Sequence, residues 1–246
     1  MDSQKLAEIN KLLIEYFGVP PRNESGSDPV DMIIATILSQ NTNDRNSFKA
    51  FQQVKAFSGD WNKIAALKED KLEELIRPAG LTKQKGKAIK NVLNSLKKKH
   101  GGISLDYIKE MPNEAAIADL TQFDGVGVKT ASCVLLFSLE RNVCPVDVHV
   151  HRTVNRILAV KTSSPDKTFV LINRHLPEGI AHSLHTNLIR LGREICRPAV
   201  PNCGACPLLN ICLYENKNLS AKAGIKKNDF MLLDNVKKSY GGAKIK

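Results

Sequence analysis

The chain has 246 residues, 42% of them apolar, so it is long enough to bury a core without covalent crosslinks. Its 36 Lys and Arg outnumber 25 Asp and Glu, and the resulting net charge of +11 favours a polyanionic partner such as nucleic acid over a generally basic surface without a ligand. Aromatic residues make up only 5%, which argues against a row of rings that stacks on single strands.

The N-terminal stretch MDSQKLAEINKLLIEYFG has no basic lead, no long apolar run and no small-residue cleavage site, so we expect no signal peptide. No apolar run reaches the roughly eighteen residues of a transmembrane helix. We therefore expect a reducing compartment in which structural disulfides are rare: cytoplasmic and nucleoid-associated, or nuclear or organellar in a eukaryote.

Apolar residues recur at helical spacing along most of the chain, and no strand pattern with hairpin turns interrupts them, which predicts an all-α fold. Asp28 followed by Pro29 is a strong helix start, with the carboxylate as N-cap. The predicted helices cover residues 6–17, 28–40, 47–57, 62–68, 70–80, 82–102, 113–123, 129–140, 149–160, 164–176 and 183–196.

Four of the six cysteines fall within one loop, CRPAVPNCGACPLLNIC, with the spacing C-x6-C-x2-C-x5-C. In a reducing compartment this pattern favours a metal site over paired disulfides. Thiolate ligands suit zinc or an iron–sulfur cluster, and the spacing alone does not separate the two. We expect the remaining two, Cys133 and Cys144, to be ordinary buried residues.

A tight turn at Gly125-Val126-Gly127 lies between two predicted helices. Glycines permit positive φ and leave their N–H groups unobstructed, and the second helix adds the free N–H groups of its first turn. This arrangement predicts a backbone clamp on a DNA phosphate, independent of base sequence.

Two side chains near this turn have the chemistry of a catalytic pair. Lys129 follows the turn, and a neutral lysine amine forms Schiff bases with aldehydic carbons; a phosphate-contacting lysine is the equal alternative. Asp147 precedes a helix and is either only its N-cap or a carboxylate that stabilises a developing sugar cation. His149 and His151 are interpreted as structural or phosphate-contacting residues, not as metal ligands.

Together these motifs resemble the endonuclease III family of helix-hairpin-helix DNA glycosylases, from about residue 5 to Cys212. The resemblance implies two helical lobes with DNA in a cleft between them. One lobe would span residues 29–135, the other would combine residues 1–28 with 136–213, and residues 214–246 would form a basic tail, disordered or pinned by its apolar FMLL segment.

The resemblance also implies roles for individual residues. The Lys129 amine would attack C1′ of a flipped-out damaged nucleotide and allow strand nicking by β-elimination, with Asp147 assisting. A family member without this lysine typically removes bases without nicking, so the chain is expected to be a bifunctional glycosylase and AP lyase. The ligands of a [4Fe–4S] cluster would be Cys196, Cys203, Cys206 and Cys212. Contacts to double-stranded DNA, made by a monomer, would come from Gln40, Asn41, Gly125, Gly127, Val128, Thr130, His149 and Arg152.

The sequence differs from the family pattern at two positions, and it does not identify the base that is removed. Asn41 stands where endonuclease III tends to have glutamine, and Asp124 replaces the proline common before the first hairpin glycine. Oxidised pyrimidines are the default substrate. The alternatives are 5-methylcytosine, since part of the chain resembles plant 5-methylcytosine glycosylases, mismatched thymine or uracil, or a non-catalytic helix-hairpin-helix module with a structural zinc.

Overall fold

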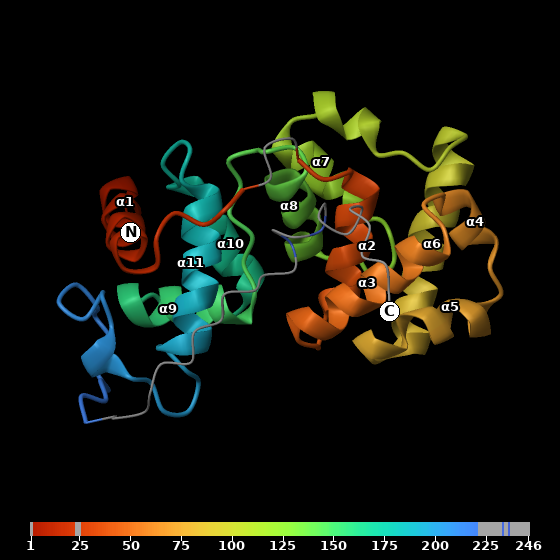
Figure 1. Ribbon diagram of the computed structural model, residues 1–246. Helices are drawn as coiled ribbons and strands as arrows, with labels where there is room; N and C mark the ends of the chain where they lie inside the picture. Colours follow the sequence, from red (N-terminus) through yellow and green to blue (C-terminus); the bar gives the residue numbers. More distant parts are fainter. Residues whose placement is uncertain (1, 23–25, 221–232, 234–235, 237–246) are drawn as a thin grey trace. The chain divides into compact units, whose positions relative to one another are not determined.

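The computed structural model describes residues 2–22 and 26–220, together with Leu233 and Val236. These residues form helices and loops only, which confirms the predicted all-α class (Figure 1). None of the helices in these ranges is long and apolar enough to cross a membrane. The predicted basic tail lies, beyond residue 220, outside the described residues except at those two positions.

The described residues divide by their contacts into two units. Unit 1 joins residues 2–21 to residues 141–220, and unit 2 spans Arg22–Glu140 and includes Leu233 and Val236. The expected lobe of 29–135 lies within unit 2 and stays a prediction. The Arg22 guanidinium donates to the carbonyl of Leu136 at 3.2 Å, which joins the two ends of this stretch.

Unit 2 contains seven helices within its described residues, and their positions match the predicted segments. They are α2 Pro29–Ser39, α3 Asp44–Phe57, α4 Trp61–Ala66, α5 Glu69–Ile76, α6 Thr82–His100, α7 Asn113–Leu120 and α8 Val128–Phe137. Two short 3-10 turns, η1 Arg77–Ala79 and η2 Asp106–Glu110, complete the unit.

The central element of unit 2 is α2. Every residue of it from Pro29 to Leu38 is buried, as expected for a helix that is apolar on nearly all sides. It packs against α3, α6 and α8. The predicted cap is confirmed, because Asp28 Oδ1 accepts hydrogen bonds from the N–H groups of Val30 and Asp31 at 2.8 and 3.0 Å.

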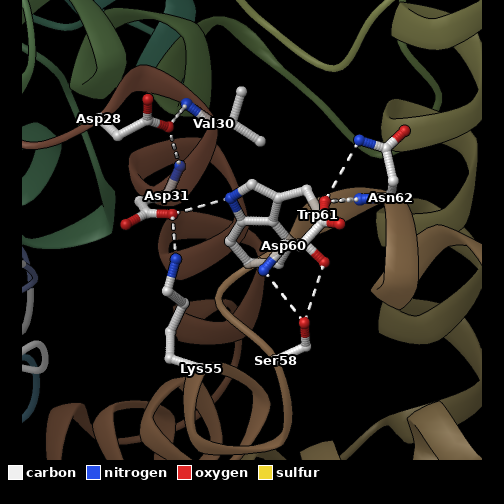
Figure 2. A network of polar contacts seen from close by, with 8 residues as sticks. All are labelled: Asp28, Val30, Asp31, Lys55, Ser58, Asp60, Trp61 and Asn62. Atoms are coloured by element: carbon white, nitrogen blue, oxygen red, sulfur yellow. Dashed lines mark hydrogen bonds and ion pairs between the residues drawn. The ribbon is translucent and has the colours of Figure 1, made fainter.

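A buried polar cluster fixes the first turn of α2 to α3 and α4 (Figure 2). Asp31 Oδ1 accepts from Lys55 Nζ at 3.0 Å and from Trp61 Nε1 at 2.8 Å. Both members of the ion pair are buried, with side-chain exposures of 7% for Lys55 and 1% for Asp31. Burial raises the pKa of Asp31 above its ordinary value, and the Lys55 charge opposes that rise.

Unit 1 is built around α11 Ala181–Glu194, which packs against both α1 Ser3–Phe17 and α9 Val148–Leu158. The remaining helix, α10 Pro165–Arg174, packs against α9. Polar side chains in α11 are buried, and one of them, His185, has its Nδ1 2.9 Å from the Pro145 carbonyl. This contact fixes the segment that leads to Asp147.

Replacing Lys55 by methionine is expected to lower the free energy of unfolding by about 3 kcal/mol at neutral pH, because Asp31 would keep its buried charge without the cation. Burial already raises the pKa of Asp31, so the folded protein binds this proton more tightly than the unfolded chain. The deficit is therefore expected to shrink as the pH falls and Asp31 becomes protonated. Urea unfolding at several pH values measures this.

The matched control is Lys49→Met on the same helix, where the side chain is exposed and the change should stay within about 0.5 kcal/mol. Equal losses in the two variants, or a Lys55→Met deficit that grows on acidification, would contradict the assignment.

Candidate active site and cysteine loop

The hairpin between α7 and α8 places its two glycines in different conformations. Gly125 has φ +87°, and a Cβ built on it would lie 2.6 Å from the Cβ of Ala88 on α6. Gly127 has φ −96° and free space around it, so neither its backbone nor its packing requires glycine. Positive φ is thus used at one of the two positions, and the open space at Gly127 leaves its N–H accessible.

The N-terminus of α8 has the free donors of an anion site. Gly127 is its N-cap, and no side chain caps the helix there. The first intrahelical bond of this turn runs from the Ala131 N–H to the Gly127 carbonyl. This leaves the N–H groups of Val128, Lys129 and Thr130 available to an anion. The Thr130 side chain itself is buried, so its contribution comes from the backbone.

The loop after α2 is joined to this hairpin. Gln40 Nε2 donates to the carbonyl of Gly125 at 3.2 Å. Asn41 is exposed and has φ +51°, an uncommon conformation that asparagine tolerates better than most residues. Asp124 is drawn toward α6 by a long contact from Asn91 Nδ2 at 3.4 Å. The structure therefore brings Gln40 to the predicted phosphate clamp.

Leu81 is a feature of the site that sequence reasoning missed. It has φ +48°, and the residue is 51% exposed immediately before α6. A bulky residue held in the left-handed region at the surface is strained and is a candidate for function. Its only signal in the sequence is an apolar residue between Gly80 and a basic helix, which is too weak to have identified it.

The two predicted catalytic residues lie in different units. Lys129 is the second residue of α8 in unit 2; it is partly exposed, and no hydrogen bond or ion pair holds its amine among the described residues. Asp147 belongs to unit 1 and is the N-cap of α9, with Oδ1 accepting from the N–H groups of His149 and Val150 at 2.8 Å each. The cap interpretation of Asp147 is correct, and it leaves a catalytic role open.

The polar residues of α9 are engaged within unit 1. Arg152 donates to the carbonyls of Gly192 at 2.8 Å and Cys196 at 3.1 Å, and it also contacts His149 Nδ1 at 3.3 Å. His151 Nδ1 lies 2.7 Å from Thr168 Oγ1, in agreement with a structural histidine. The structure thus places Arg152 between α9, α11 and the cysteine loop, and the predicted DNA contacts of His149 and Arg152 stay predictions.

The four clustered cysteines line one pocket with an empty volume of about 370 Å³, part of it open to solvent. The pocket also has apolar walls, including Ile157, Leu191 and Ile195. Burial raises the pKa of Cys206 to about 12. Across the described parts of the chain, no three His, Cys, Asp or Glu residues converge on a point that could hold a single metal ion.

The other two cysteines, Cys133 and Cys144, are fully buried, as predicted.

A second arginine of α9 holds the cysteine loop. Arg156 donates to the carbonyls of Arg197 and Pro198, both at 2.8 Å, and to Cys196 Sγ at 3.5 Å. Its guanidinium also stacks over the Tyr214 ring, 4.7 Å from the centroid. Sequence reasoning placed Arg156 on this helix but assigned it no role, because the helix and the loop are some forty residues apart in sequence.

Residues 34–178 match the model of the HhH-GPD superfamily of base excision DNA repair proteins. The chain belongs to this superfamily. Endonuclease III of Thermotoga maritima is 33% identical to this HhH-GPD chain, and the aligned region covers 86% of this chain and 94% of the Thermotoga protein. A thymine-DNA glycosylase of Aeropyrum pernix is 26% identical, and the aligned region covers 89% of this chain and 99% of the Aeropyrum protein. Among solved structures, a trapped endonuclease III–DNA covalent intermediate covers 87% of this chain and 96% of its own, with a TM-score of 0.73 and 24% identity.

These comparisons confirm the predicted endonuclease III resemblance and the class, an enzymatic DNA glycosylase that binds DNA. The non-catalytic module is not favoured. The roles of individual residues are not decided by them, and those roles stay predictions.

The two hairpin glycines are expected to separate stability from DNA binding. Gly125→Ala should lower the free energy of unfolding by about 2 kcal/mol, because it combines a clash with positive φ, and should weaken duplex binding. Gly127→Ala should cost at most about 1 kcal/mol, the usual loss for alanine at an N-cap, yet weaken duplex binding roughly tenfold by covering the phosphate donors. Urea unfolding and fluorescence anisotropy measure the two effects.

Gly102→Ala is the matched control, because a Cβ at Gly102 meets nothing within 4 Å and the residue lies outside the hairpin. If Gly127→Ala binds duplex as wild type does, the α8 N-terminus is not the phosphate clamp.

Proposed function

We propose that this HhH-GPD protein removes a damaged pyrimidine from duplex DNA and then nicks the strand as an AP lyase. The observation that carries the proposal is the position of Lys129. Lys129 is partly exposed and stands in the first turn of α8, directly after a hairpin whose backbone N–H groups are free to hold a phosphate. Phosphate binding there would bring a sugar within reach of a nucleophile.

The chemistry starts with a base that is flipped out of the duplex so that its C1′ becomes accessible. The neutral Lys129 amine attacks C1′, and the base leaves with the electron pair of the glycosidic bond and takes up a proton. The sugar ring opens to a Schiff base, loss of a C2′ proton follows, and the 3′ phosphate departs by β-elimination. Water then releases the lysine.

Asp147 is proposed to accept a proton from Lys129 and to stabilise positive charge on the sugar. Its capping bonds to His149 and Val150 support the role, because they hold the carboxylate in one orientation. Gln40, Asn41 and Leu81 are proposed to occupy the space left by the flipped base. An exposed leucine suits this task, since apolar side chains are common wedges between base steps.

Oxidised pyrimidines such as thymine glycol are the proposed substrates, in keeping with the similarity to endonuclease III. The similarity to a protein named thymine-DNA glycosylase makes mismatched thymine the second candidate. The protein is proposed to act as a monomer wherever its DNA resides, in the nucleoid, the nucleus or an organelle.

We further propose that Cys196, Cys203, Cys206 and Cys212 hold a [4Fe–4S] cluster. Their common pocket supports this donor set, because all four cysteines line it together with apolar residues and Arg156 offers a hydrogen bond to the Cys196 sulfur. The cluster would crosslink the loop and take no part in base removal. Arg156 and the apolar walls would hold the loop and limit the access of water.

The catalytic pair is tested by borohydride trapping on a duplex with one abasic site. Lys129→Gln is expected to abolish trapping, with a loss of roughly a hundredfold or more. Asp147→Asn keeps an oxygen that can accept the two α9 N–H groups, so folding should be retained while the trapping rate falls by roughly 10²-fold through loss of the charge.

Lys11→Gln, an exposed lysine on α1, is the control and should trap as wild type. Binding without trapping by the wild type would remove the lyase assignment. Full trapping by Lys129→Gln would show that another amine is the nucleophile.

The cofactor is tested on protein purified without oxygen. We expect about four iron and four sulfide per chain, lost in Cys203→Ser and kept in Cys144→Ala, since Cys144 is buried away from the pocket. Stoichiometric zinc without sulfide would contradict the cluster.

A further inference from the structure

Unit 2 buries a lysine that the proposed chemistry does not use. Lys85, in the second turn of α6, is 2% exposed. Its ammonium donates to the carbonyl of Leu38 at 2.9 Å and to that of Ala79 at 2.7 Å. Within the described residues no carboxylate pairs with it, and burial lowers the pKa of Lys85 to about 8. Burying a cation without a carboxylate partner costs free energy, and two carbonyl acceptors offset only part of that cost. A stabilising role alone is therefore an unusual explanation for this lysine.

The two carbonyls belong to segments that lead into exposed, strained residues. Leu38 is in the last turn of α2, just before Gln40 and Asn41. Ala79 ends η1, just before Leu81. One ammonium therefore joins the ends of both segments that are proposed to enter the gap in the duplex. Each of these segments also contains a residue with positive φ, Asn41 in one and Leu81 in the other.

Helix α6 also contacts the hairpin. Ala88 is the neighbour of Lys85 on the helix surface at an interval of three residues, and Asn91 follows Ala88 at the same interval. Ala88 abuts Gly125, where even one added carbon would lie 2.6 Å away, and Asn91 Nδ2 lies 3.4 Å from Asp124 Oδ2. Thus one helix, α6, contacts both the phosphate clamp and the two segments that are proposed to enter the gap.

We propose that Lys85 is a positioning residue that sets the two gap segments, at Gln40–Asn41 and at Leu81, in register with the phosphate-binding hairpin. An ammonium serves this purpose where an apolar residue does not, because it bonds two carbonyls from separate segments at once. The proposal rests on the proposed function, since the register matters only if the segments enter DNA. It assigns Lys85 to recognition of the damage site, with no contact to the reacting atoms.

The test uses two duplexes, one intact and one with a tetrahydrofuran abasic analogue opposite 2-aminopurine. Lys85→Met keeps the length of the side chain and removes its donors. Binding to the intact duplex, which needs only phosphate contacts, should change less than about twofold. Preference for the abasic duplex should fall at least about fivefold, and the fluorescence change of 2-aminopurine at saturation should fall by about half, because the segments no longer enter the gap together.

Val92→Ala is the control, a cavity variant on the same helix at a fully buried position away from the loops. If Lys85 only stabilises the fold, its replacement would reduce the binding of both duplexes equally. Val92→Ala is expected to show this equal loss when it is measured near the unfolding temperature of that variant. All binding is measured well below that temperature. If Lys85→Met does not fold, Lys85→Gln, which keeps one donor group, goes through the same comparison.

Unchanged preference for the abasic duplex, or an equal loss on both duplexes, overturns the positioning role. Failure of both variants to fold also overturns it, since stability alone would then explain the residue. A wild type that neither prefers the abasic duplex nor traps on it would instead refute the proposed function. Borohydride trapping by the wild type in the same preparation distinguishes these cases.

Discussion

The constraint on which unit 2 depends is the burial of α2 on nearly every side. Because this helix has no exposed face, any shift of it would open a cavity in the core. Its ends still carry polar groups, and these are satisfied by buried cations: Lys55 through Asp31 at the N-terminal end and Lys85 through the Leu38 carbonyl at the C-terminal end. The loop that follows α2 thus begins from a fixed point.

Local sequence signals were sufficient for the helices and for several of their ends. Asp28 is a cap as predicted, and Asp147 is a cap as the first of its two interpretations held, because capping depends on a side chain and on backbone groups two or three residues away. The hairpin and the class of protein were also predicted correctly. Gly127 shows the limit of this reasoning, since a glycine in a turn permits positive φ without requiring it.

The residues that the sequence did not identify are recognised only through tertiary contacts or backbone conformation. Lys85 looked like one more lysine on a basic helix, and only the fold brings its ammonium to carbonyls of other elements. Arg156 bonds the cysteine loop from a distant helix, and Leu81 acquires interest only through its exposure and its backbone angles. Pairings of this kind depend on tertiary packing, which a single sequence without an alignment does not reveal.

The contact between Ala88 and Gly125 couples two positions that seem unrelated in sequence. A Cβ added at Gly125 would lie 2.6 Å from the Cβ of Ala88, so a larger side chain at either position would clash with the other residue. Replacement of an alanine within a helix looks mild in the sequence, yet a larger side chain at position 88 would press on the backbone of the hairpin. In the interpretation of natural variants, position 88 therefore belongs with the residues of the hairpin, although its side chain is buried in the protein.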